Sequence, residues 1–268
     1  MPKQKLDLCL LRANILPMMA FFFVSCNNVS GQAGFVDVEA KAADTARNWD
    51  LRQQILNQKR FREIDSTKSY SQIKSKILID KSKIDRKLVG DDSLGRVFSD
   101  WLVYRIIPYW YGTPWDFDGY TATPKQGVIA CGYFVSTTLS HAGLNVNRYK
   151  MAQQLPVHEA QTLALSTEVL VVEGTETDEI IARMDSLISS GLYFLGFDGS
   201  HVGYLLKEQD NLYVIHANYI GSGGVAVERI QDSLAFAGYR KFYLVPISGN
   251  KELMRKWRLG EEVSVVEG

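Results

Sequence analysis

The pattern of apolar and polar positions divides the chain into a helical first part and a strand-rich second part. Over 94–106, apolar residues return every three or four positions, which predicts an amphipathic helix that ends before Pro108. The stretch 178–190 has the same spacing and predicts a helix that Gly191 stops. Later stretches are β-branched, aromatic or alternating between turn residues, and predict strands at 192–197, 201–207, 212–218, 224–229 and 241–247. The gaps are too short for crossover helices, so we expect an antiparallel meander.

The N-terminus is similar to a bacterial signal peptide. Three basic residues precede an apolar run over 15–24, which is ten residues long and too short to cross a bilayer. The run ends in Phe-Val-Ser-Cys, which resembles a lipobox. The resemblance implies cleavage before Cys26 and lipidation of Cys26, with the membrane as a partner. Asn27 then favours an outer-membrane anchor facing the periplasm. The alternatives are an ordinary signal peptide and a buried N-terminal helix.

Changes in composition predict the domain organisation. Small polar residues after Cys26 are typical of a flexible tether, and the lysine-rich stretch that follows favours helix. This helical arm could pack on the main domain, or could be a cell-wall-targeting or autoinhibitory domain. The predicted segments are a signal peptide at 1–25, a tether at 26–43, the arm at 44–90, a main domain at 91–248 and a charged, fraying tail at 249–268.

Composition and charge narrow the function classes. The chain has 268 residues, 46% of them hydrophobic and 22% charged, which is ordinary for a globular protein. Its formal net charge is zero, so it lacks the basic footprint of a nucleic-acid-binding protein. The sequence has no zinc-ligand cluster and no glycine-rich phosphate loop. We therefore expect no nucleic-acid partner, no metal and no cofactor.

The stretch 127–135, Gly-Val-Ile-Ala-Cys-Gly-Tyr-Phe-Val, carries the strongest candidate for chemistry. Gly127 breaks the preceding structure, and the apolar spacing after it places Cys131 at the start of a helix. A helix N-terminus favours negative charge and can lower the pKa of a thiol. With Cys9 removed and Cys26 lipidated, Cys131 would be the only thiol of the mature chain. The alternative is an inert, buried cysteine.

Two predicted strands supply candidate partners for the thiol. If Lys207 pairs with Leu212, then His201 faces Asn218 and Gly203 faces His216, and both histidines and the asparagine project from one face of the sheet. A thiolate nucleophile needs a base, and the base needs an orienting partner. The same face would also have to pack against the Cys131 helix. Singly, each histidine could instead be a structural residue.

An aromatic stretch at 109–120 is interrupted by glycine and proline. Such a loop either packs on the core or lines a groove that binds sugar or peptide. The candidate groove residues are Trp110, Trp115, Phe117 and Tyr120.

The order of these motifs resembles the NlpC-type cysteine peptidases, papain-like enzymes that cut bacterial cell-wall peptides. The matching motifs are a helix-borne cysteine, His-Val-Gly at 201–203 and Ile-His-Ala at 215–217. The resemblance implies that Cys131 is the nucleophile, His201 the base and His216 the orienter, with Asn218 as an alternate. Tyr111 would help to line the oxyanion site. Where the family has Asp and Ser around the cysteine, this chain has Ala130 and Gly132, and 114–126 corresponds to an insertion.

The resemblance implies an α+β, papain-like fold in which the helix bearing the nucleophile packs on an antiparallel sheet. The helical arm precedes this domain in the chain. The expected function is a cysteine peptidase or amidase that cleaves amide bonds in peptidoglycan stem peptides, between D-glutamate and a diamino acid by family analogy. Two alternatives stay open. One is acyl transfer or amide cleavage on another polymer by the same residues, and the other is a non-catalytic binding lipoprotein of the cell envelope.

Overall fold

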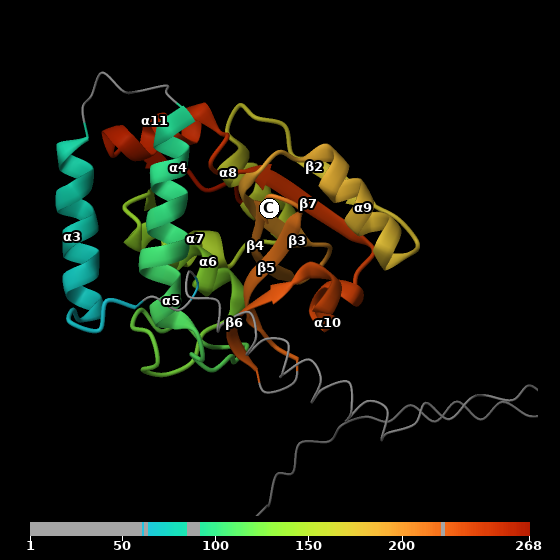
Figure 1. Ribbon diagram of the computed structural model, residues 1–268, viewed down its shortest axis with the longest axis horizontal. Helices are drawn as coiled ribbons and strands as arrows, with labels where there is room; N and C mark the ends of the chain where they lie inside the picture. The colour runs from blue at the N-terminus through green and yellow to red at the C-terminus, as the bar shows by residue number, and fades with distance from the viewer. Residues whose placement is uncertain (1–60, 62–63, 85–91, 221–222) are drawn as a thin grey trace, which may run out of the picture. The chain divides into compact units, whose positions relative to one another are not determined.

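A computed structural model describes residues 61, 64–84, 92–220 and 223–268 (Figure 1). The predicted signal peptide, the lipidation site Cys26, the tether and residues 44–60 of the arm lie outside the described residues. Within the described ranges, no helix is long and apolar enough to cross a membrane.

The centre of the fold is a six-stranded sheet in which every neighbouring pair of strands is antiparallel. In spatial order, the strands are β2 (Leu170–Glu173), β7 (Lys241–Pro246), β3 (Gly191–Phe197), β4 (His201–Glu208), β5 (Asn211–Asn218) and β6 (Gly224–Arg229). Strands β3 to β6 form a meander as predicted, and Lys207 pairs with Leu212 in the predicted register. The fifth predicted strand, β7, does not extend the meander beyond β6 but returns to pair with β3. The α+β class with an antiparallel sheet is therefore confirmed.

The sheet is buried on both faces because alternate residues of its strands are apolar on each side. In β3, Leu192 and Phe194 enter one core cluster, whereas Leu195 and Phe197 enter the other. Helices α9 and α10 cover the second face, and α4, α6 and α8 lie over the first (Figure 1).

Three of the helices that cover the sheet, α4, α6 and α9, begin close to the predicted positions. The first face carries α4 (Asp92–Trp101), α6 (Cys131–His141), α7 (Arg148–Ala152) and α8 (Pro156–Ala164). The second face carries α9 (Thr177–Leu187), the 3₁₀ turn η3 (Ile230–Asp232) and α10 (Leu234–Ala237). Helix α9 ends before the predicted stop, because Ile188 already has extended backbone angles.

The helix that begins with α4 does not end before Pro108, so this prediction is wrong. It continues as a π-helical segment, η2 (Leu102–Ile106), and then as α5 (Ile107–Trp110). The N–H of Ile107 bonds to the carbonyl of Leu102, five residues back. Pro108 thereby falls in the first turn of α5, where a missing N–H costs little.

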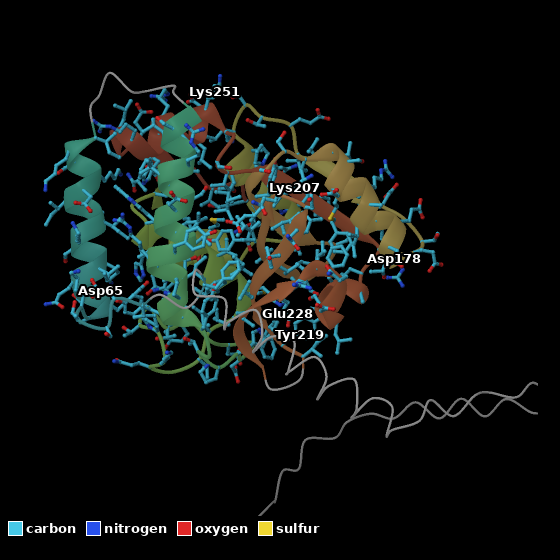
Figure 2. The ribbon with its side chains drawn as sticks, viewed as in Figure 1. Asp65, Asp178, Lys207, Tyr219, Glu228 and Lys251 are labelled. Atoms are coloured by element: carbon cyan, nitrogen blue, oxygen red, sulfur yellow. The ribbon has the colours of Figure 1, made fainter. Side chains whose placement is uncertain are left out.

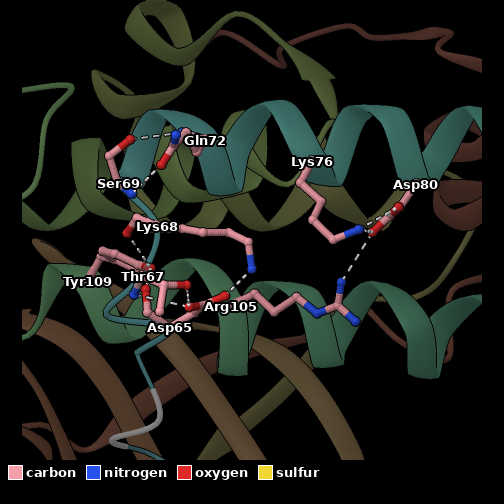
Figure 3. Close-up of polar contacts among 9 residues, drawn as sticks. All are labelled: Asp65, Thr67, Lys68, Ser69, Gln72, Lys76, Asp80, Arg105 and Tyr109. Atoms are coloured by element: carbon pink, nitrogen blue, oxygen red, sulfur yellow. Dashed lines mark hydrogen bonds and ion pairs between the residues drawn. The ribbon is translucent and has the colours of Figure 1, made fainter.

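One helix of the predicted arm is described, α3 (Tyr70–Lys83), and it packs on the rest of the fold through the buried side chains of Ile73 and Ile77. Its start is fixed by a capping box, in which Ser69 accepts from the backbone N–H of Gln72 and Gln72 accepts from that of Ser69 (Figure 3). Polar contacts link α3 and the turn before it to η2 and α5. Tyr109 donates to the carbonyl of Asp65 over 3.1 Å, and Arg105 pairs with Asp80 over 3.5 Å (Figure 3).

The C-terminal residues 249–268 do not form a fraying tail, which corrects the prediction. They form α11 (Lys251–Leu259) and a short strand, β8 (Glu262–Val263), that pairs in parallel with β1 (Asn145–Val146). The charged residues of α11 alternate with a buried apolar face that includes Leu253 and Trp257. The indole N–H of Trp257 donates to a backbone carbonyl at the end of α6 over 2.9 Å.

Candidate active site

Cys131 is the first residue of α6, as predicted. Gly127 adopts a φ of +89°, which turns the chain before the helix, and Ile129 bridges to the backbone of Trp115 and Tyr120. Ala130 has extended backbone angles and caps the helix. The half-buried Cys131 lines a cavity of about 580 Å³, which places the thiol where a ligand can reach it.

The two strand histidines are hydrogen-bonded to each other. His201 Nε2 and His216 Nδ1 lie 2.8 Å apart, and both residues are almost completely buried. Phe197 and Tyr219 pack edge-on against the His201 ring, with centroid distances of 4.7 and 5.1 Å. Because Nε2 of His201 is engaged by His216, Nδ1 is the nitrogen of His201 left for the cavity, which His201 also lines.

The contacts continue beyond His216 to an acidic residue. His216 Nε2 lies 3.3 Å from Oε2 of Glu228, and Asn218 donates to Oε1 of Glu228 over 2.9 Å. Glu228 is fully buried in β6 (labelled in Figure 2). Asn218 therefore orients Glu228 and is bonded to it, whereas His216 is the residue bonded to His201.

Helix α6 does not pack on the face that carries the histidines, contrary to prediction. Its buried residues join the core on the opposite face, where Phe134 meets Tyr204. The N-terminus of α6 nevertheless lies close to the start of β4, at the end of the sheet. There Cys131 Sγ lies 3.9 Å from the carbonyl oxygen of Ser200, the residue just before His201. Cys131 and His201 therefore line the same cavity, although the helix that carries Cys131 packs on one face of the sheet and His201 projects from the other.

Burial determines the protonation states of this pair. Desolvation raises the pKa of Cys131 to about 11, although the backbone N–H of Val202 favours the thiolate. Desolvation also lowers the pKa of His201 well below its usual value, and the neighbouring His216 lowers it further. The lowered thiol pKa predicted from the helix N-terminus is thus outweighed by desolvation. Without substrate, both groups are neutral near pH 7.

The predicted groove residues separate into two groups. Trp115 and Phe117 line the cavity beside Cys131. Trp110, by contrast, is fully buried and donates its indole N–H to the Tyr70 hydroxyl over 2.7 Å, so it belongs to the core. Tyr120 is 63% exposed and is not among the residues that line the cavity.

Tyr111 does not take the predicted place beside the nucleophile. It packs against the main core, and it is not among the residues that line the cavity. Its hydroxyl is buried without a hydrogen-bond partner in the described part of the chain, and burial raises its pKa.

Sequence reasoning missed several residues of the site. Tyr219 and Tyr239 line the cavity and their hydroxyls lie 3.3 Å apart; Ser200 Oγ lies 3.0 Å from that of Tyr239. Glu159 of α8 also lines it. The available signal for Glu228 was its position as an acid directly after the apolar stretch 225–227, two residues beyond the alanine that pairs with His216. The residues of α8 gave no comparable signal.

Comparison with protein-family models, with curated proteins and with solved structures found no match to this chain. Among the described residues, no group of three or more His, Cys, Asp and Glu side chains could hold a metal ion.

Proposed function

We propose that this chain is a papain-like, NlpC-type cysteine hydrolase that cleaves amide bonds in peptidoglycan stem peptides. The observation that carries the proposal is a chain of hydrogen bonds that begins at His201 in the cavity wall and leads inward through His216 to Glu228. Cys131 begins a helix at the cavity, His201 shares that cavity, and the His201–His216 bond of 2.8 Å leads to the buried Glu228. A nucleophile, a base and an orienting group in this order are the parts that acyl-transfer chemistry needs.

The hydrogen-bond directions fix the tautomers of the two histidines. Asn218 donates to Glu228, and an acceptor-only carboxylate also takes the N–H of His216 Nε2. His216 Nδ1 then accepts from His201 Nε2–H, which leaves a lone pair on Nδ1 of His201. This nitrogen is the base on the cavity side.

In the proposed reaction, Nδ1 of His201 takes the proton of the Cys131 thiol as Sγ attacks the amide carbonyl carbon. The C=O π bond opens to an oxyanion, which backbone N–H groups at the start of α6 stabilise. The C–N bond then breaks, and His201 returns the proton to the leaving amine. Water, deprotonated by His201, hydrolyses the resulting thioester and restores the thiol.

Because both groups are neutral without substrate, the proton transfer accompanies the attack. The positive charge that develops on His201 is shared through His216 with Glu228, so a group that burial alone would keep neutral can accept the proton.

The substrate class and location are proposed from the sequence resemblances. A lipid on Cys26 would hold the enzyme at the membrane, facing the periplasm from the outer membrane. The open cavity with Trp115 and Phe117 on its wall suits a peptide that carries apolar groups.

One observation favours a second candidate, a non-catalytic binding lipoprotein with the same cavity. The pKa of Cys131 is raised to about 11, which is the behaviour of a structural thiol. In this alternative the aromatic wall binds a ligand that is not cleaved.

Digestion of purified peptidoglycan by the full chain and by Cys131→Ser separates the two candidates. The proposal predicts soluble peptide fragments from the wild type, identified by mass spectrometry, and none from the variant. An added amine acceptor distinguishes hydrolysis from acyl transfer, since transfer gives amide-linked products. If both proteins bind peptidoglycan and neither releases fragments from it, the second candidate would be supported and the first overturned.

A further inference from the structure

Glu159 is a buried acid beside the nucleophile that the proposed reaction does not use. It lies in the first turn of α8, is 2% exposed, and forms part of the cavity wall. Its Oε2 atom has no hydrogen-bond partner in the described part of the chain. A buried polar atom without a partner is costly, and in a cavity wall it indicates a ligand group that completes it.

The backbone of α6 makes room for this carboxyl. A Cβ added to Gly132 would lie 2.7 Å from the carbonyl oxygen of Ala152 and 3.1 Å from Oε1 of Glu159. A side chain at position 132 would therefore clash with the carbonyl of Ala152 and with the carboxyl of Glu159. The acid is thereby held next to Cys131, and its charge, when present, raises the pKa of that thiol.

The rest of the cavity suits a cation. Glu159 is the only carboxyl group among the described residues of its lining, which include no Lys or Arg. Five other lining residues are aromatic, and aromatic faces attract ammonium groups, as the Arg148 guanidinium 5.4 Å from the centre of the Tyr133 ring illustrates. The aromatic lining residues are Trp115, Phe117, Tyr133, Tyr219 and Tyr239.

We propose that the cavity recognises a substrate that carries a protonated primary amine, with Glu159 as the counter-ion of that amine. The inference rests on the proposed function in that it takes the Cys131 cavity as the substrate site. Stem peptides that contain a diamino acid offer such an amine. Once the bound amine has ionised Glu159, like-charge repulsion would direct the carboxylates of the peptide away from it.

Binding should also release a proton. Burial raises the pKa of Glu159 well above its usual value, which favours the neutral carboxyl in the empty site. The titratable groups that interact electrostatically with Glu159 are the thiol of Cys131 and the phenol of Tyr204, whose pKa values burial also raises. An incoming ammonium favours the carboxylate, and the displaced proton leaves to solvent.

The test uses the full chain as Cys131→Ser, which blocks turnover, and a matched pair of probes. Nα-acetyl-lysine amide carries the amine, and Nα-acetyl-norleucine amide ends in a methyl group instead. Isothermal titration at pH 7 in two buffers of different ionisation enthalpy gives both affinity and proton release. We expect the lysine probe to bind roughly 10- to 100-fold more tightly, as for a charge-assisted hydrogen bond, with release of one proton.

The variant Glu159→Gln should abolish both the preference for lysine and the proton release, whereas Glu168→Gln, at an exposed position, should keep both. Equal affinities of the two probes, or an unchanged preference in Glu159→Gln, would overturn the inference. If Glu159→Gln does not fold, the comparison of the two probes on the parent protein still decides. These titrations measure binding alone, so a peptidoglycan digest without products leaves their outcome unaffected, and an active enzyme without lysine preference refutes this inference alone.

Discussion

Replacing Glu228 by glutamine should reverse the direction of the hydrogen bonds in the site. The glutamine oxygen can still accept from Asn218, but its amide N–H group then faces His216 Nε2 where the carboxylate accepted. His216 must turn Nε2 into an acceptor and carry its proton on Nδ1. That proton is donated to His201 Nε2, so the proton of His201 moves to Nδ1 on the cavity side. The base then has no free lone pair for the thiol.

The expected loss is large because the variant keeps the shape of the site and removes its base. Forcing the catalytic histidine of a serine protease into the wrong tautomer lowers kcat by about 10⁴-fold, so a loss on the order of 10³- to 10⁴-fold in kcat is expected here. If His216 resists the change, two buried donors face each other, which costs roughly 1–3 kcal/mol of unfolding free energy.

Two measurements check this prediction. Stem-peptide hydrolysis gives kcat, and ¹⁵N NMR of the imidazoles gives the tautomers, which a merely structural role would not change. Glu173→Gln, at an exposed position of β2, is the matched control and should leave both unchanged. A Glu228→Gln enzyme with kcat within threefold of wild type, or with Nδ1 of His201 still unprotonated, would refute the assigned directions.

Three further outcomes are expected. Since burial raises the pKa of Cys131 to about 11, the thiol deprotonates only as pH rises toward 11, so its alkylation by iodoacetamide should keep accelerating from pH 7 to 10; a rate that levels off below pH 7 would contradict this. Gly132→Ala places a Cβ 2.7 Å from a backbone oxygen of α7 and should lower the unfolding free energy in urea by about 1–3 kcal/mol, whereas Gly249→Ala, whose Cβ meets no atom closer than 3.6 Å, should be nearly neutral. Trp257→Ala should cost roughly 3–5 kcal/mol in the same assay, because this side chain is fully buried; an unchanged midpoint would mean that α11 contributes little to the core.

The meander from β3 to β6 and its register could be predicted because the relevant signals are local, whereas the return of β7 to pair with β3 depends on a longer connection and was not predicted. Strand alternation and the short turn after Glu208 fix the pairing of Lys207 with Leu212, and this pairing places His201 beside His216. The start of α6 at Cys131 likewise follows from a nearby turn and an apolar repeat.

The missed features depend on contacts between distant segments. Trp257 of α11 is buried against the end of α6. The many charged residues of α11 therefore gave no sign that the helix packs on the core. Trp110 looked like a loop residue because the π-helical segment that carries the helix past Pro108 has no sequence signature. Glu159 comes to the cavity only through the packing of α8 against the sheet.

Burial also changed the electrostatic prediction. A helix N-terminus alone favours a thiolate, but burial of Cys131 beside the start of β4 removes water from the sulfur, and desolvation dominates. The balance between these two effects depends on the tertiary structure and cannot be obtained from the spacing around one cysteine.

The central claim is that Cys131 forms a covalent acyl intermediate during amide hydrolysis. The most direct test is acid quenching of the full chain during turnover of a stem peptide, followed by peptide mapping in a mass spectrometer. The account predicts a hydroxylamine-sensitive acyl adduct on the peptide that contains Cys131, and neither adduct nor product with Cys131→Ser. Hydrolysis at an equal rate by Cys131→Ser would contradict it.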